Sequence, residues 1–299
     1  MKLHKIKFIV IASLVLFLFS TPAFSQKAEA AYPPVPDAYL ALFFSHIVYD
    51  GQQAVFKGQS PTGKLLNGTY SPGFNNSWKI INKNGYYTKF TPSTYGNAIG
   101  AGQYRMYDAL SNPKNNFYGA IYKHVTENKY IVAFAGTDTS ELGDWASDAL
   151  IGVGMWGGPA QLKQARMLVS KIPKNASKVV YTGHSLGGYI AAEMTIETGK
   201  PSIVFNAPGF VSTDSRLRAY TSPNKNLIIR HEFDKDPILA VLAVRKKIPV
   251  QGYPLPVGIP ADYRPGSRII YGKDIKSSKV AKNVHALRNF YTVKLHQGY

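Results

Sequence analysis

One short motif constrains the fold of this chain more than any other feature. The segment GHSLGG at residues 183–188 lies between an apolar run at 178–182, which predicts a buried strand, and a stretch at 186–198, which predicts a helix. A sharp strand-to-helix turn strains the backbone of its central residue and leaves no room for side chains two positions before and after it. Because both of those positions are glycine, the sequence predicts such a turn with Ser185 at its centre.

The rest of the chain alternates between strand and helix patterns. Predicted strands lie near 78–81, 86–90, 117–123, 129–135, 202–205 and 226–230. Predicted helices span 38–49, with Asp37 as the cap, 159–172 and 279–291. This alternation implies an α/β fold in which helices flank both faces of a mostly parallel sheet. Since no internal repeat or low-complexity linker divides the chain, we expect a single domain.

A serine at this turn needs a base to become a nucleophile at neutral pH. On a fold with this turn, the chain order of the catalytic groups is Ser, then Asp or Glu, then His. Of the three histidines that follow the turn, His231 ends an apolar strand, which is typical of a core position, and His296 lies close to the end of the chain. His285 stands at the head of a predicted helix, so we expect it to be the base, with a solvated helix histidine as the alternative.

The acid that orients this base is expected just after the strand near residues 226–232. Side chains at the carboxyl ends of parallel strands face the crevice of such a sheet. Asp236 precedes Pro237, which fixes the turn, and it is the predicted acid. Asp234 is the alternative, because strand ends are predicted only to within about two residues.

The N-terminus has the three-part layout of a secretory signal peptide. Three lysines precede a 12-residue apolar run at 8–19, which is shorter than the roughly 20 residues of a membrane span. Small residues near 23–25 and 28–30 supply cleavage sites. We therefore expect a signal peptide at 1–25, with cleavage as late as residue 30, and a secreted domain at 31–299; a retained N-terminal anchor is the alternative.

The chain is strongly basic and contains no cysteine. Its formal charge is +18, with 35 Lys and Arg against 17 Asp and Glu. Such a field favours an anionic partner such as a lipid surface, although charge also serves solubility alone. Nine basic residues lie close together in sequence: Arg245, Lys246, Lys247, Arg264, Arg268, Lys273, Lys276, Lys279 and Lys282. They predict docking to an anionic membrane surface, with a merely solvated face as the alternative.

Residues 115–291 resemble the class 3, fungal-lipase-like family of the α/β-hydrolase superfamily. The segment IVAFAGT at 131–137 is similar to the family's strand ending in Arg-Gly-Ser/Thr, and WASD at 145–148 is similar to its following Trp-x-x-Asp. The serine motif at 183–188 and the Asp-Pro-Ile segment at 236–238 also resemble family motifs. His285 stands where the family has its last histidine.

The resemblance implies an α/β-hydrolase-like fold and a Ser185, Asp236 and His285 triad. Thr137 would be an oxyanion residue, and the backbone N–H of Leu186 would be the second donor, as the residue after the nucleophile. Asp148 would support the Thr137 loop, and Trp145 belongs to an apolar, glycine-hinged segment that resembles a lid or the wall of an acyl pocket. Packing of that segment in the core is the alternative.

Three departures separate the chain from the family. Ala135 stands where the family has Arg, two more residues separate Gly136 from Trp145 than in the fungal enzymes, and the disulfides of fungal members are absent. These departures leave the expected mechanism in place but do not define the expected substrate.

The leading function is a secreted serine carboxylic-ester hydrolase, a lipase that cleaves acyl esters of lipids through an acyl-enzyme. Alternatives are a phospholipase A1 on anionic membranes, an esterase for small or aromatic esters, and a non-catalytic secreted binder of anionic polymers. No groove-reading motif and no metal-ligand spacing occur, so neither a nucleic-acid partner, nor a metal, nor another cofactor is expected. The sequence makes no prediction of the oligomeric state.

Overall fold

The structure is a computed structural model that describes residues 38–56, 58, 79–81, 87–89, 103–136, 158–210, 213–234, 236, 263–271, 287–292 and 295. All of these residues belong to one compact unit, Pro36–Tyr299. The predicted signal peptide and its cleavage sites lie outside the described residues. No helix among the described residues is long and apolar enough to cross a membrane.

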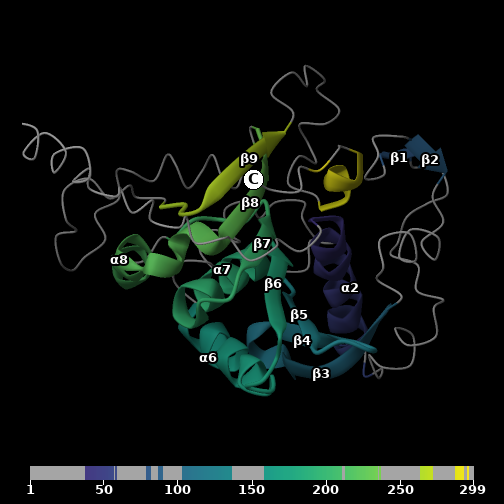
Figure 1. Cartoon of the computed structure of the whole chain (residues 1–299), viewed down its shortest axis with the longest axis horizontal. Helices are drawn as coiled ribbons and strands as arrows, with labels where there is room; N and C mark the ends of the chain where they lie inside the picture. Colours follow the sequence, from purple (N-terminus) through teal and green to yellow (C-terminus); the bar gives the residue numbers. More distant parts are fainter. Residues whose placement is uncertain are drawn as a thin grey trace, which may run out of the picture. The chain divides into compact units, whose positions relative to one another are not determined.

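A seven-stranded mixed sheet forms the centre of this unit (Figure 1). In sheet order the strands are β3 (Tyr104–Asn112), β4 (Phe117–His124), β5 (Lys129–Phe134), β6 (Lys178–His184), β7 (Ser202–Phe205), β8 (Ile228–Phe233) and β9 (Ser267–Tyr271). The first three strands pair antiparallel, and β5 through β9 are all parallel. The predicted α/β fold with a mostly parallel sheet is confirmed.

Helices cover both faces of the sheet, as predicted. Helix α2 (Ala38–Phe56) packs on one face against β4 to β7, and α6 (Gly158–Val169) and α7 (Leu186–Thr198) pack on the other (Figure 1). A short helix, α8 (Thr213–Thr221), lies beside α7. The hydrophobic core fills the layer between the sheet and α6 and α7, where Phe134, Tyr181 and Ala192 are almost fully buried.

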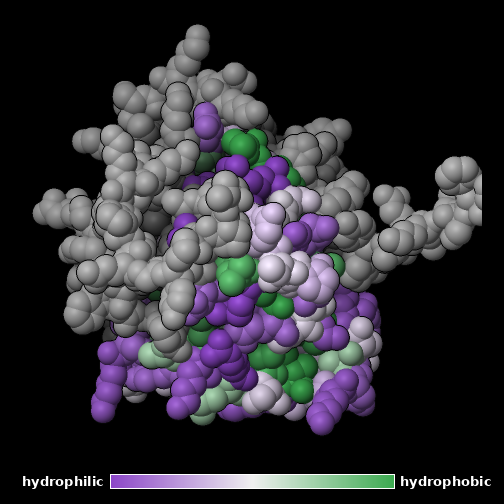
Figure 2. All heavy atoms as spheres, turned by 90° about the vertical axis from the view of Figure 1, so that its left-hand side faces the viewer, coloured by the Kyte–Doolittle hydropathy of each residue, from purple (hydrophilic) through white to green (hydrophobic). Residues whose placement is uncertain are grey.

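The described part of the surface on the side of α6 and α8 is mainly polar. Figure 2 shows hydrophilic side chains there with hydrophobic side chains in separate areas between them. Apolar atoms make up much of any folded surface, so these areas by themselves indicate no particular partner.

Helix α2 is bound to the sheet by hydrogen bonds as well as apolar contacts. The hydroxyl of Thr182 on β6 lies 2.6 Å from Ser45 Oγ and also contacts the carbonyl oxygens of Ala41 and Ile203, at 3.1 and 2.8 Å. Ala41 and Ser45 are one helical turn apart, so they face the same strand. The helix continues seven residues beyond the predicted end at 49.

Several predicted boundaries agree with the structure. The helix at 186–198 and the strand at 202–205 have the predicted limits. A short hairpin joins β1 (Lys79–Ile81) and β2 (Tyr87–Lys89), where two short strands were predicted. Helix α6 ends at Val169, three residues earlier than predicted.

Other predictions were wrong or incomplete. Strand β8 begins at Ile228 rather than 226, because Pro223 favours a 3-10 helix, η5 (Pro223–Leu227), whose first turn is capped by Ser222. The described part of the predicted C-terminal helix is a 3-10 helix, η7 (Leu287–Thr292), and not an α-helix. The edge strands β3 and β9 and helix α8 had no counterpart in the prediction.

Candidate active site

Ser185 occupies a strained turn between β6 and α7. Its backbone has φ 55° and ψ −128°, a conformation that non-glycine residues rarely adopt, and its side chain is largely buried. A Cβ atom on Gly183 would overlap the backbone of Gly187, and one on Gly187 would overlap the carbonyl oxygen of Phe134. The glycine requirement predicted from the sequence is therefore confirmed at both positions.

Leu186 is the first residue of α7 and directly follows the candidate nucleophile. The helix starts with a hydrogen bond from the Tyr189 N–H to the Ser185 carbonyl oxygen at 3.1 Å. A helix has no internal acceptor for the N–H groups of its first turn, and its N-terminus favours negative charge. The Leu186 N–H is thus suited to bind an oxyanion that forms beside Ser185.

Two side chains of α2 contact backbone carbonyl oxygens, one at the serine turn and one just after β5. The Tyr49 hydroxyl lies 3.1 Å from Nδ1 of His184 and donates to the His184 carbonyl oxygen at 3.3 Å. The Gln52 side-chain amide donates to the carbonyl oxygen of Gly136 at 3.4 Å. Gly136 directly precedes Thr137, so α2 bridges the serine turn and the start of the predicted oxyanion loop. Neither residue was predicted from the sequence, because their spacing indicates only one face of a helix.

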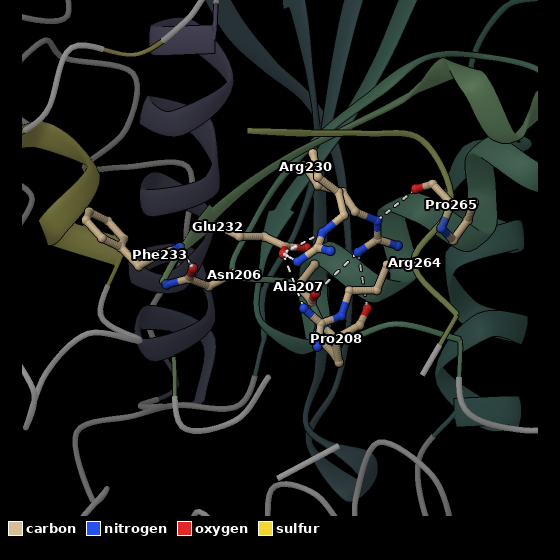
Figure 3. Close-up of polar contacts among 9 residues, drawn as sticks. Asn206, Ala207, Pro208, Arg230, Glu232, Phe233, Arg264 and Pro265 are labelled. Atoms are coloured by element: carbon tan, nitrogen blue, oxygen red, sulfur yellow. Dashed lines mark hydrogen bonds and ion pairs between the residues drawn. The ribbon is translucent and has the colours of Figure 1, made fainter. Parts of the chain in front are cut away.

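Backbone hydrogen bonds join the carboxyl ends of β6, β7 and β8. The Ser185 N–H donates to the Phe205 carbonyl oxygen at 3.0 Å, and the Asn206 N–H donates to the His231 carbonyl oxygen at 2.8 Å. The Asn206 side-chain oxygen accepts from the Phe233 N–H at 2.9 Å (Figure 3). The ends of these three neighbouring strands therefore form one edge of the sheet, which carries Ser185 at one end.

Asp236 lies at the other end of this edge, three residues beyond β8. Its side chain is only 1% exposed, and its N–H bonds the Phe233 carbonyl oxygen at 3.4 Å. Asp234 is half-buried, and its N–H donates to the carbonyl oxygen of Tyr271 on β9. The choice of Asp236 rather than Asp234 as the acid stays a prediction.

The structure places only part of the predicted site. Ser185, Leu186 and Asp236 follow the parallel strands β6 and β8, on either side of β7. The remaining predicted site residues lie outside the described residues: His285, Thr137, Trp145 and Asp148. His231 is fully buried, stacks on Phe205 and lies 2.7 Å from the Tyr271 hydroxyl, so it is a core residue as expected.

A buried arginine supports the loop that follows β7. The side chain of Arg230 is fully buried and donates to the carbonyl oxygens of Ala207 at 3.2 Å, Pro208 at 3.4 Å and Pro265 at 2.9 Å (Figure 3). These contacts join the loop after β7 to the segment before β9. Burying a guanidinium is costly unless its donors are satisfied, and carbonyl oxygens satisfy several of them here.

Two residues of the basic cluster pair with one buried carboxylate. Glu232 is 2% exposed, and its Oε2 accepts from Arg264 at 3.2 Å and from Arg268 at 2.7 Å. Arg264 is itself largely buried. These two guanidinium groups share one carboxylate, and the Arg268 side chain remains 42% exposed. The other seven basic residues lie outside the described residues, so the predicted membrane docking stays a prediction.

Glu193 on α7 is a second buried carboxylate, and it lies away from the strand ends. It accepts from the Tyr189 hydroxyl at 2.7 Å and pairs with Arg218 of α8 at 3.1 Å. Burial raises the pKa of Glu193, while both contacts oppose this by favouring the charged form. Its partners tie α8 to α7, which makes its role structural.

Within the described parts of the chain, no group of three His, Cys, Asp or Glu side chains could hold a metal.

The fold and the serine turn together define an α/β-hydrolase-like protein with a nucleophile elbow. Residues 87–233 match the model of the phospholipase-like family, described as a Tle-like phospholipase domain. This match confirms the predicted resemblance to lipases, and it includes Ser185 but ends before Asp236 and His285.

One sequence relative and several solved structures are similar to this chain. Extracellular phospholipase A1 of Serratia liquefaciens is 34% identical over 103 residues, which is 34% of this chain and 30% of that protein. The chain thus matches less than a third of that relative's length. A triacylglycerol lipase from Penicillium expansum is 12% identical, with 79% and 78% coverage and a TM-score of 0.43. The Rhizomucor miehei lipase in complex with its propeptide is 12% identical, with 68% and 62% coverage and a TM-score of 0.41.

Proposed function

We propose that this protein is a secreted serine hydrolase that cleaves acyl ester bonds of phospholipids, as a phospholipase A1. The observation that carries this proposal is the elbow: Ser185 has a positive φ between two glycines that cannot carry a Cβ atom. A strained backbone at a buried serine costs stability, and such strain is typical of nucleophiles in this turn. The phospholipase family match over the same segment favours phospholipids over triacylglycerols and small esters.

The proposed reaction proceeds through an acyl-enzyme. His285 takes the Ser185 hydroxyl proton as the oxygen attacks the ester carbonyl carbon, and it then protonates the departing alkoxide of the lysophospholipid. Water, deprotonated by the same histidine, then attacks the acyl carbon. The bond to the Ser185 oxygen breaks, the fatty acid leaves, and the histidine returns the proton to the Ser185 oxygen. Asp236 orients the imidazole and stabilises its protonated form. The N–H groups of Leu186 and Thr137 bind the oxyanion in both steps, and no cofactor is needed.

The preference for Asp236 over Asp234 gives a prediction. Replacing Asp236 by Asn should lower kcat on the order of 10⁴-fold, because an amide neither stabilises the imidazolium nor holds the required tautomer. Asp234→Asn is the matched control and should change kcat less than tenfold. Steady-state kinetics on a soluble nitrophenyl ester measures both effects. The reverse ranking would assign the acid to Asp234.

Phospholipid specificity is tested with the purified protein and defined lipid surfaces. We expect release of fatty acid and lysophospholipid from anionic vesicles at rates well above those from neutral vesicles or triacylglycerol emulsions. Binding to anionic vesicles should weaken as salt rises, because charges are screened beyond about 8 Å at physiological ionic strength. Hydrolysis of triacylglycerol without phospholipid cleavage would identify a plain lipase. Hydrolysis of soluble esters alone would identify an esterase, and binding without hydrolysis would identify a polymer binder.

A further inference from the structure

We propose that Asn206 is a positioning residue that holds the acid turn of Asp236 in register with the nucleophile turn of Ser185. This inference rests on the proposed function, since it assigns to Asn206 a role in that same site. Asn206 directly follows β7, which is the strand between the one that ends at Ser185 and the one that leads to Asp236.

Strand β7 ends just before Asn206, whereas the adjacent strand β8 continues to Phe233. Asn206 itself has a φ of 41°, in the left-handed region, where asparagine is one of the few tolerated residues besides glycine. Its N–H still makes the sheet bond to the His231 carbonyl oxygen at 2.8 Å. In a parallel pair, the backbone carbonyl of the same residue would then accept from the residue two positions further along the partner strand, here Phe233.

The side chain of Asn206 supplies the acceptor for that next bond. Its Oδ1 receives the Phe233 N–H at 2.9 Å, and the whole residue is fully buried (Figure 3). The amide oxygen therefore takes the place of a backbone carbonyl, so β8 keeps its pairing for one more bond after β7 has left the sheet. A glycine would allow the same turn but would have no such oxygen.

The two ends of the candidate site are joined through this residue. On one side, the Ser185 N–H bonds the carbonyl oxygen of Phe205, the residue before Asn206, at 3.0 Å. On the other side, Phe233 bonds Asn206 and its carbonyl oxygen accepts from the Asp236 N–H at 3.4 Å. Displacement of a catalytic group by about 1 Å can cost on the order of 100-fold in rate, so loosening this connection should affect turnover.

The test is Asn206→Gly, which allows the positive φ and removes the side-chain amide, including the oxygen that accepts from the Phe233 N–H. Asn116→Gly is the control for the glycine substitution, because Asn116 also has a positive φ, of 57°, but is exposed and lies before β4, three strands away from β7. Its backbone carbonyl oxygen, which accepts from the Gln52 side chain at 3.0 Å, is kept in the variant. On a soluble nitrophenyl ester, we expect Asn206→Gly to lower kcat by about 10- to 100-fold with KM within about threefold. Asn116→Gly should stay within about twofold of the parent in both constants.

Two further readouts separate positioning from a general loss of structure. In an Asp236→Asn background, Asn206→Gly should lower kcat by less than about threefold, because the group it positions is already absent. The Phe233 amide should exchange with solvent at least tenfold faster in Asn206→Gly than in the parent, and no faster in Asn116→Gly. An equal loss in both backgrounds would make the role of Asn206 structural and overturn the inference.

Other outcomes are equally decisive. If Ser185→Ala is inactive but folded Asn206→Gly keeps the parental kcat, the positioning inference fails and the proposed function stands. If Ser185→Ala keeps the parental rate, the proposed function fails, and the inference fails with it. Should Asn206→Gly not fold, Asn206→Asp retains an oxygen at the same place, and a loss beyond about tenfold in that folded variant would contradict the inference.

Discussion

Replacing Ser185 by Ala should lower ester hydrolysis on the order of 10⁶-fold, because no other group at the elbow can form the acyl intermediate. The fold should persist, because an alanine at a φ of 55° is strained about as much as a serine, and the change removes only one oxygen. Turnover of a nitrophenyl ester and the thermal unfolding midpoint measure the two effects separately.

Ser170→Ala is a matched control for this change. Ser170 lies at the end of α6, where its hydroxyl donates to the Met167 carbonyl oxygen at 2.8 Å, and it is exposed. Its loss should leave kcat within about twofold of the parent. Activity of folded Ser185→Ala within tenfold of the parent would show that Ser185 is not the nucleophile.

Replacing His285 by Ala should have a similar effect, again on the order of 10⁶-fold, because the serine and its base act as one unit. The base must be neutral to accept the serine proton, so parental activity should decrease as pH falls below about 6 to 7. His296→Ala serves as the control and should retain activity. Loss of activity in His296→Ala together with an active His285→Ala would move the base to His296.

Local patterns in the sequence predicted the central part of the fold well. The strand at 202–205 and the helix at 186–198 were predicted at their observed limits, because apolar periodicity and the flanking glycines depend on residues close together in the chain. The edge strands were missed because their pairing depends on residues far apart in the chain. Strand β9 alternates between partly buried and exposed residues and pairs with β8, which is over 30 residues away. Nothing local to β9 indicates that partner.

The same contrast between local and long-range information separates the site residues that were predicted from those that were missed. Ser185 was identifiable from a motif of six residues, since the glycines that its turn needs are its near neighbours. Asp236 was predicted from its place after a strand and before Pro237, and the structure places it buried beyond β8. His285 and Thr137 remain predictions from the sequence.

By itself, then, the sequence determined the elbow, the class of sheet around it and the identity of the candidate nucleophile. Only the tertiary structure revealed the contacts that hold this edge together: Tyr49 on the His184 backbone, Arg230 on the loop after β7, and Asn206 as the acceptor for β8. The physical reason is range. A strained turn is specified by residues within two positions of its centre, whereas these hydrogen bonds join residues 23 to 135 positions apart, and only the folded sheet brings them together.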